Sequence, residues 1–230
     1  MLASQSYFSD EEQPFFDWRW LADNFADEIL PAFGQHVVLS LVPVVIALAI
    51  SLPVGIFCAR NRAFYPPVTA FAGVLYTIPS LAFFVMLVPI VGTGNLPVII
   101  ALTAYSLLIL IRNVVTGLDS VPNDTKDAAR GMGLTERQIL WRVEFPLALP
   151  VIVAGIRIAT VTVIGIASIA AYIGAGGLGR PIFDGIDRDF NTPIIVGALL
   201  VALLAMTTDV SLARFERYLR PWARRSGGAT

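Results

Sequence analysis

The sequence predicts an all-α membrane protein with about five transmembrane helices, and three features of the chain favour this fold class. Hydrophobic residues make up 56% of the 230 residues and charged residues only 14%, whereas soluble proteins carry about 25% charged residues. Five hydrophobic runs each hold about 20 residues or more, enough for a helix to cross the ~30 Å core of a bilayer. Basic residues gather in alternate connections between these runs, as in multi-pass membrane proteins.

Residues 1–34 are expected to form an extracytoplasmic segment with a short amphipathic helix. The segment is acidic and contains a single basic residue, Arg19, so it lacks the basic start of a signal peptide. Phe16, Trp20, Phe25 and Ile29 recur at helical spacing and can form one apolar side. This side can lie in the membrane interface, which tryptophan favours. We favour packing against the helical bundle over a receptor role.

The transmembrane domain is expected over residues 35–213. Four prolines, Pro43, Pro53, Pro79 and Pro89, lie inside its first two hydrophobic runs. Spanning helices tolerate proline where neighbours satisfy the freed carbonyl, so these residues either shape a pore or belong to helix packing. The five expected spans cover residues 37–58, 68–91, 96–115, 151–173 and 193–212.

The basic residues predict an orientation with the N-terminus outside and residues 214–230 forming a cytoplasmic basic tail. Twelve basic residues then fall on the cytoplasmic side and three on the outer side, with Arg157 set aside inside a span. The cytoplasmic set is Arg60, Arg62, Arg112, Lys126, Arg130, Arg137, Arg142, Arg214, Arg217, Arg220, Arg224 and Arg225, and the outer set is Arg19, Arg180 and Arg188.

The one long polar stretch inside the apolar chain, residues 124–150, is expected to contain two short helices joined by a glycine. Asp124 and Asp127 have the spacing of a capping box and place carboxylates at the positive end of the first helix. Ala128 and Ala129 are strong helix formers with little bulk. Gly133 can then end the helix in the left-handed conformation. A partner protein could approach this helix closely.

The second helix of this stretch should begin at Thr135, because Gln138 follows three residues later and completes a T-x-x-Q capping box. We expect it to end near Val143, before Pro146, because proline disfavours a continuing helix. The stretch is either an elbow that docks on another protein or a solvated hairpin that joins two spans.

The same residues resemble the E-A-A motif of ATP-binding cassette (ABC) importer permeases. The motif reads Asp127-Ala128-Ala129, three residues, Gly133, nine residues, and then Val143-Glu144-Phe145-Pro146. The chain departs from the family pattern by Asp for Glu, Val for Ile and Phe for Leu. The resemblance implies that residues 117–150 form the coupling loop that sits in a cleft of a cytosolic ATPase, with Asp127, Ala128, Ala129, Gly133, Thr135 and Pro146 as its coupling residues.

Glycines 174, 176, 177 and 179 interrupt the fourth span on its outer side. Their G-x-G pattern lacks the Gly-Lys-Ser/Thr ending of a phosphate loop and follows a membrane helix. We interpret Gly174, Gly176, Gly177 and Gly179 as a candidate outer gate or loop, and a tight turn is the alternative.

This glycine run narrows the resemblance to one group of ABC importer permeases. Three further segments support the same resemblance: 77–81 (TIPSL), 110–113 (LIRN) and 150–157 (PVIVAGIR). Over residues 35–220 the chain is similar to permeases of quaternary-amine importers, which carry glycine betaine, choline, carnitine or related osmoprotectants. The implied fold is a MetI-like permease core with a cytoplasmic coupling helix. A methionine-type importer permease is the nearest competitor.

Two ionisable residues fall within the expected spans. Arg157 lies about 10 Å into the fourth span, and Asp209 lies at comparable depth near the cytosolic end of the fifth. Because an unpartnered charge there costs at least a few kcal/mol, we hypothesise a structural ion pair between Arg157 and Asp209. The alternative is that Arg157 extends to the headgroups and Asp209 pairs with the basic tail.

The chain is not expected to be an enzyme or to hold a cofactor or metal. It has no G-x-x-x-x-G-K-S/T or H-E-x-x-H motif and a single cysteine and histidine, so ATP and Mg belong on a partner ATPase. The resemblance implies further partners: a second permease, identical or paralogous, and a separate substrate-binding protein, since no binding domain follows residue 230. Membrane lipid surrounds the spans, and nucleic acid is not expected.

Other residues carry weaker hypotheses. Tyr76, Tyr105 and Tyr172 could meet a quaternary ammonium through cation–π contacts, but packing is the more common use of such tyrosines. An intramembrane enzyme would need a nucleophile and a base together, and we expect Ser168 to have no histidine in its leaflet. A scaffold that recruits a cytosolic protein through residues 117–150 without moving solute is a further alternative.

Overall fold

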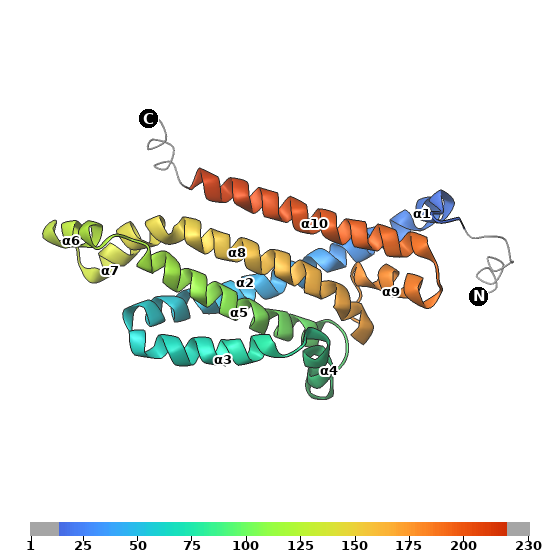
Figure 1. Ribbon diagram of the computed structural model, residues 1–230, viewed down its shortest axis with the longest axis horizontal. Helices are drawn as coiled ribbons and strands as arrows, with labels where there is room; N and C mark the ends of the chain where they lie inside the picture. Colours follow the sequence, from blue (N-terminus) through green and yellow to red (C-terminus); the bar gives the residue numbers. More distant parts are fainter. Residues whose placement is uncertain (1–13, 220–230) are drawn as a thin grey trace.

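Four long helices, α2, α5, α8 and α10, lie side by side and form the body of the protein in the computed structural model, which describes residues 14–219 (Figure 1). Short helices cap its two ends: α6 and α7 lie at one end, and α1 and α9 at the other. In chain order the elements are α1 (Trp18–Asn24), η1 (Phe25–Ile29), α2 (Leu30–Arg60), η2 (Arg62–Phe64), α3 (Tyr65–Thr77), α4 (Ser80–Val91), α5 (Asn95–Asp119), α6 (Asn123–Gly131), α7 (Glu136–Ile139), η3 (Leu140–Glu144), α8 (Phe145–Ala167), η4 (Ser168–Ile173), α9 (Gly179–Asp187) and α10 (Asn191–Tyr218).

The predicted fold class is confirmed. Four helical segments are long and apolar enough to cross a membrane, at 18–60, 95–119, 136–173 and 191–218, and a fifth span is possible if the bent pair α3–α4 crosses as one. All described elements are helical. Large apolar side chains such as Ile90 and Phe71, 77% and 68% exposed, lie on the outside, as expected where lipid replaces water.

The second expected span, residues 68–91, is not one straight helix. It is broken into α3 and α4, which meet at an angle of 94°. Ile78 and Pro79 both have extended backbone, with ψ of 128° and 135°, because the ring of Pro79 disfavours a helical residue before it. The Tyr105 hydroxyl donates a 2.6 Å hydrogen bond to the Ile78 carbonyl freed by this break.

Tyr105, one of the three tyrosines considered for cation binding, therefore has a structural role. It is 2% exposed, and its ring makes edge contacts with Tyr76 and Phe83, each at a centroid distance of 5.8 Å. Tyr172, in η4, is 66% exposed, with its ring 6.2 Å from that of Phe183. Tyr76 and Tyr105 are thus in contact with each other, whereas the ring contact of Tyr172 is with Phe183.

The short N-terminal helix is continuous with the first span, so the expected boundary at residue 34 is not a break in the helix. The Asp17 carboxylate caps α1 by accepting from Arg19 N–H and Trp20 N–H. The Trp20 ring packs edge-on against Phe190 at 5.5 Å, which fastens α1 to the start of α10, and Ile29 is buried while Phe25 is half exposed. Predictions for residues 1–13 and for Arg220, Arg224 and Arg225 lie outside the described residues.

Three glycines let α2, α5 and α8 approach closely. A Cβ at Gly55 on α2 would lie 2.6 Å from Val114 Cγ1, and one at Gly117 on α5 would lie 3.1 Å from the Ala148 carbonyl oxygen. On α8, a Cβ at Gly155 would lie 2.4 Å from the Cβ of Asn113. Small residues at helix contacts are typical of membrane bundles, where van der Waals packing drives association.

Candidate functional site

The polar stretch folds as the expected helix–glycine–helix elbow, with α6 as its first arm. Gly133 adopts a φ of 84°, and its N–H donates to the Arg130 carbonyl at 2.9 Å while Leu134 N–H donates to the Ala129 carbonyl at 3.2 Å. These bonds satisfy the carbonyls at the end of α6, which confirms the predicted left-handed end. The prediction of a capping box between Asp124 and Asp127 is wrong, because α6 begins after Pro122 and has no side-chain cap.

The second arm begins as predicted and ends differently. Thr135 Oγ1 accepts from Gln138 N–H while the Gln138 side chain accepts from Thr135 N–H, which confirms the capping box. The helix does not stop before Pro146: it continues through the π-helical turn η3 into α8. Pro146 lies in the first turn of α8, where the shifted register of η3 accommodates a residue without an N–H.

The two alanines of the motif face opposite ways. Ala129 is 1% exposed and packs inward, whereas Ala128 is exposed. Met132, 73% exposed, follows on the same outward-facing part of the elbow. This part lies at the extreme end of the molecule (Figure 1), so a partner would meet Ala128 and Met132 but not Ala129.

Charged side chains hold the two arms of the elbow together. Arg130 Nη1 donates to Asp127 Oδ1 at 2.7 Å, and its Nε donates to Glu136 Oε1 at 2.8 Å. The carboxylates of Glu136 and Asp127 raise the pKa of the Arg130 guanidinium above its usual value. Arg60, the last residue of α2, lies 3.8 Å from Glu136 and so connects this network to the first span.

Sequence reasoning missed Glu144, which occupies the variable position before Phe145-Pro146 in the motif. It is 2% exposed and is the one Asp, Glu, Lys or Arg residue that is buried within residues 14–219. Its Oε2 accepts from Arg60 Nη2 at 2.6 Å, and its Oε1 lies 3.4 Å from Lys126 Nζ. The carboxylate therefore joins three elements, α2, α6 and η3. The signal in the sequence that could have identified this buried carboxylate is a glutamate in a strongly apolar context.

At the other end of the molecule the predicted outer glycines form a closely held loop. Gly174, Gly176 and Gly177 have φ values of 80°, 77° and 74°, which favour glycine. A Cβ at Gly179, the first residue of α9, would lie 1.8 Å from the Ser168 carbonyl oxygen. All four positions thus require glycine, three by conformation and one by contact.

Two adjacent residues of α2 bind this loop. Gln35 Nε2 donates to the Ala175 carbonyl at 2.8 Å, and Gln35 Oε1 accepts from Gly177 N–H at 3.1 Å. His36 is fully buried; its Nδ1 accepts from Leu178 N–H at 3.3 Å, so the ring proton sits on Nε2, 3.1 Å from the Ile164 carbonyl. A backbone N–H can only donate, which fixes this tautomer.

The expectation that Ser168 has no histidine in its leaflet is wrong, since His36 contacts Ile164, one turn before Ser168 on the same run of helix. Ser168 Oγ is nevertheless buried and makes no hydrogen bond to any residue within 14–219. Both nitrogens of His36 are occupied by backbone groups. The pair is therefore not arranged as a nucleophile and its base.

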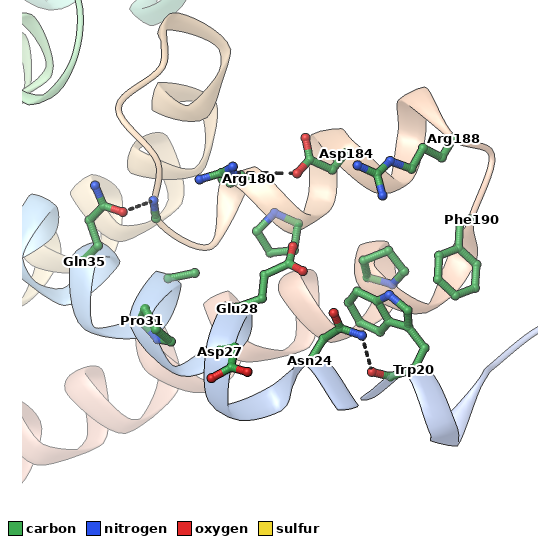
Figure 2. Close-up of a pocket in the computed structure, with 14 residues that line it drawn as sticks. Trp20, Asn24, Asp27, Glu28, Pro31, Gln35, Arg180, Asp184, Arg188 and Phe190 are labelled. Atoms are coloured by element: carbon green, nitrogen blue, oxygen red, sulfur yellow. Dashed lines mark hydrogen bonds and ion pairs between the residues drawn. The ribbon is translucent and has the colours of Figure 1, made fainter. Parts of the chain in front are cut away.

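A cavity of about 450 Å³ opens beside the glycine loop, between the N-terminal helices and α9 (Figure 2). Figure 2 shows Gln35 turned toward the loop backbone and Glu28 pointing between the helices. Arg180 pairs with Asp184 across one turn of α9 at 3.8 Å. The lining residues are Trp20, Asn24, Asp27, Glu28, Pro31, Ala32, Gln35, Gly177, Arg180, Pro181, Asp184, Arg188, Phe190 and Pro193.

The structure places the guanidinium of Arg157 on α8 against the carboxylate of Asp209 on α10, with Nε donating to Oδ1. Glu216, two turns further along α10, lies 3.6 Å from Arg157 Nη1. Both Arg157 and Asp209 are somewhat more than one third exposed, so the pair lies on the side of the bundle. No group of three or more His, Cys, Asp or Glu residues within 14–219 is arranged to hold a metal ion.

Comparisons with known proteins agree with this architecture. Residues 51–221 match the family model described as binding-protein-dependent transport system inner membrane component. The chain is 38% identical over 194 residues to the glycine betaine/carnitine/choline transport system permease protein OpuCB of Bacillus subtilis (strain 168), covering 84% of this chain and 89% of that protein. It is 43% identical over 192 residues to the osmoprotectant import permease protein OsmW of Salmonella typhimurium, covering 81% and 89%.

A solved structure shares the fold. An inward-facing conformation of the MetNI methionine ABC transporter superposes with a TM-score of 0.75 and 26% identity, covering 83% of this chain and 95% of the matched chain.

Proposed function

This chain belongs to the family of binding-protein-dependent transport system inner membrane components, and from that membership we propose that it is the permease subunit of an ABC importer for quaternary-amine osmoprotectants such as glycine betaine, choline or carnitine. The observation that carries the proposal is the 38–43% identity to OpuCB and OsmW over more than four fifths of the chain. The methionine transporter, at 26% identity, supports the fold more than the substrate.

In this proposal the chain forms half of a pathway, and two permeases pair around a two-fold axis. ATPase subunits, which bind ATP and Mg, dock on the α6–α7 elbow, and a binding protein delivers solute to the opposite end. The N-terminus is outside and the C-terminus cytoplasmic, which is supported by Arg60, Lys126 and Arg130 lying at the elbow end. The glycine loop 174–179 then belongs to the outer mouth.

The coupling role proposed for the elbow is supported by its position and exposure. It projects from the end of the bundle (Figure 1), its outward surface carries Ala128 and Met132, and its two arms are fixed by Gly133 and by the Arg130–Glu136 ion pair. ATP must favour one conformation of the complex to move the pathway, and a rigid elbow can pass such a movement to the spans.

Replacement of Gly133 tests this role. Gly133→Val should insert in the membrane but lose ATP-driven uptake, because a β-branched residue at a φ of 84° is strongly disfavoured and would change the angle between the arms. Gly131→Ala is the matched control, since a Cβ there meets nothing within 4 Å and needs no unusual φ. Uptake at the wild-type rate in Gly133→Val would refute the coupling assignment.

The substrate is tested by reconstitution with candidate ATPase and binding-protein partners and a panel of labelled betaine, choline, carnitine and methionine. ATP-dependent accumulation of one of the three amines, with methionine excluded, is the expected result. Accumulation of methionine alone would replace the proposal by the methionine-type alternative. Binding of the partners with no movement of any solute would favour the scaffold.

A further inference from the structure

Helix α2 is attached by polar side chains at both of its ends to the two regions that the proposed transport cycle must connect. At one end, its last residue, Arg60, donates to the buried carboxylate of Glu144 at 2.6 Å and lies 3.8 Å from Glu136 of the elbow. At the other end, Gln35 and His36 bind the backbone of the glycine loop. The helix contains 31 residues and therefore spans about 45 Å.

The attachment at the elbow end is built around one carboxylate. The Glu144 side chain is 3% exposed, and the two cations that reach it come from different elements, Arg60 from α2 and Lys126 from α6. Lys126 is itself largely buried, with its side chain 18% exposed, and its Nζ also lies 3.4 Å from the Leu118 carbonyl. Because charges held in a buried site have few alternative partners, α2, α6 and η3 are held in one relative position.

The attachment at the other end is equally local. A Cβ at Gly176 would lie 2.4 Å from Gln35 Oε1, and one at Gly177 would lie 3.2 Å from His36 Nδ1. The glycines thus allow the loop to lie directly on α2. A displacement of this end of α2 must carry the loop with it or break up to three hydrogen bonds.

We infer that Glu144 and Arg60 are positioning residues of the transport cycle, which fasten the coupling elbow to α2 so that its movement reaches the glycine loop at the outer mouth. The inference rests on the proposed function and adds the connection between its two ends. Glu144 touches neither solute nor nucleotide in this scheme. It acts by keeping the end of α2 fixed to α6 while the ATPase displaces the elbow.

The test uses the complete importer in proteoliposomes and measures solute uptake and ATP hydrolysis in the same sample. Glu144→Gln and Arg60→Gln should lower the solute moved per ATP by about two- to thirtyfold, the range of measured coupling effects. Arg60→Lys, which keeps the charge, should recover much of the ratio. Arg62→Gln is the matched control: Arg62 is two residues away and pairs with Asp119, but its side chain is 55% exposed, and the variant should keep the wild-type ratio.

A second readout follows the outer end directly. Tyr172 is 66% exposed and lies just before the glycine loop, so the substitution Tyr172→Cys provides a labelling site there. The native Cys58 is fully buried and does not compete for the label. The rate of maleimide labelling at position 172 should change when ATP binds the complex, and Arg60→Gln should abolish that change. A purely structural role would reduce the amount of assembled complex and leave the ratio and the nucleotide response of the assembled fraction unaltered.

The outcomes separate the two proposals. A wild-type complex that moves no solute overturns the proposed function and this role with it. A wild-type complex that moves solute, with Glu144→Gln and Arg60→Gln at the wild-type ratio, overturns the role of Glu144 and Arg60 alone. Should Glu144→Gln fail to assemble, Arg60→Gln decides, because it leaves Glu144 paired with Lys126.

Discussion

Gly155 lies at a close contact between α8 and α5, and alanine at this position should destabilise the protein. The added Cβ would lie 2.4 Å from Asn113 Cβ and 2.6 Å from its Cγ, whereas non-bonded carbons are in contact at about 3.5–4.0 Å. The Asn113 side chain cannot turn away freely, since its Nδ2 donates to the Ile109 carbonyl at 2.8 Å. The helices must therefore separate by more than about 1 Å locally.

The size of the effect follows from two opposing contributions. Forcing extra atoms into a packed interface costs about 1–3 kcal/mol, while alanine in place of glycine favours a helix by about 0.5–1 kcal/mol. Gly165, ten residues along the same helix, isolates the second contribution, because a Cβ there meets nothing within 4 Å. The difference between Gly155→Ala and Gly165→Ala is therefore about 1–3 kcal/mol.

Thermal unfolding of the purified permease in detergent measures this difference. For a chain of this size about 2–4 °C of Tm corresponds to 1 kcal/mol, so Gly155→Ala should unfold about 2–12 °C below Gly165→Ala. Gly165→Ala should match or exceed the wild type. Equal Tm values for the two variants would show that the α5–α8 contact is not tight at Gly155, and the packing argument would fail.

Three further changes give distinct expectations. Tyr105→Phe leaves the carbonyl at the α3–α4 bend without its donor and should lower the free energy of unfolding by about 1–3 kcal/mol, measured by thermal unfolding. Asp209→Asn should lower the free energy of unfolding by less than about 1 kcal/mol, because Glu216 remains 3.6 Å from Arg157. The double variant Asp209→Asn, Glu216→Gln should lower it by more than the sum of the two single variants. An additive result would contradict the idea that the two carboxylates share Arg157 as their partner. Gln35→Leu should speed amide exchange in the glycine loop about tenfold by removing two hydrogen bonds, and unchanged exchange would show that the loop holds itself.

Local chemistry in the sequence was sufficient to predict those features that depend on residues close together along the chain. The left-handed end at Gly133 and the capping box of Thr135 with Gln138 depend on groups within a few residues of one another. The lengths of the apolar runs likewise predicted the membrane class before any contact was known. The pairing of Arg157 with Asp209 required only that two charges at comparable depth have a strong reason to meet.

The same rules failed where tertiary surroundings decide what a proline does. Pro79 breaks a helix by 94°, whereas the helix runs on through Pro146 into α8. Both prolines remove a donor, but Tyr105 takes up the carbonyl exposed at the first, and the π-helical turn before the second shifts the register. Neither device is visible from the residues next to the proline.

The two attachments of α2 were also beyond sequence reasoning, because their partners are far apart along the chain. Arg60 and Glu144 are separated by 84 residues, and His36 and Leu178 by 142. Periodicity identifies which faces of a helix are apolar, but it does not show which polar group on a neighbouring element fills a gap. The burial of His36 against the glycine loop was for this reason not predictable from the residues next to it.

Stability alone is a poor reason for a charge at position 144. Replacing a buried ion pair by well-packed apolar side chains is often neutral or stabilising, and apolar residues such as Leu140 and Ala148 already pack nearby. An apolar side chain, however, would hold α2, α6 and η3 by shape only and would allow them to slide. A carboxylate 2.6 Å from Arg60 and 3.4 Å from Lys126 favours one arrangement of the three and resists displacement of any one of them. This resistance to displacement is required if a movement imposed on the elbow is to be transmitted to α2.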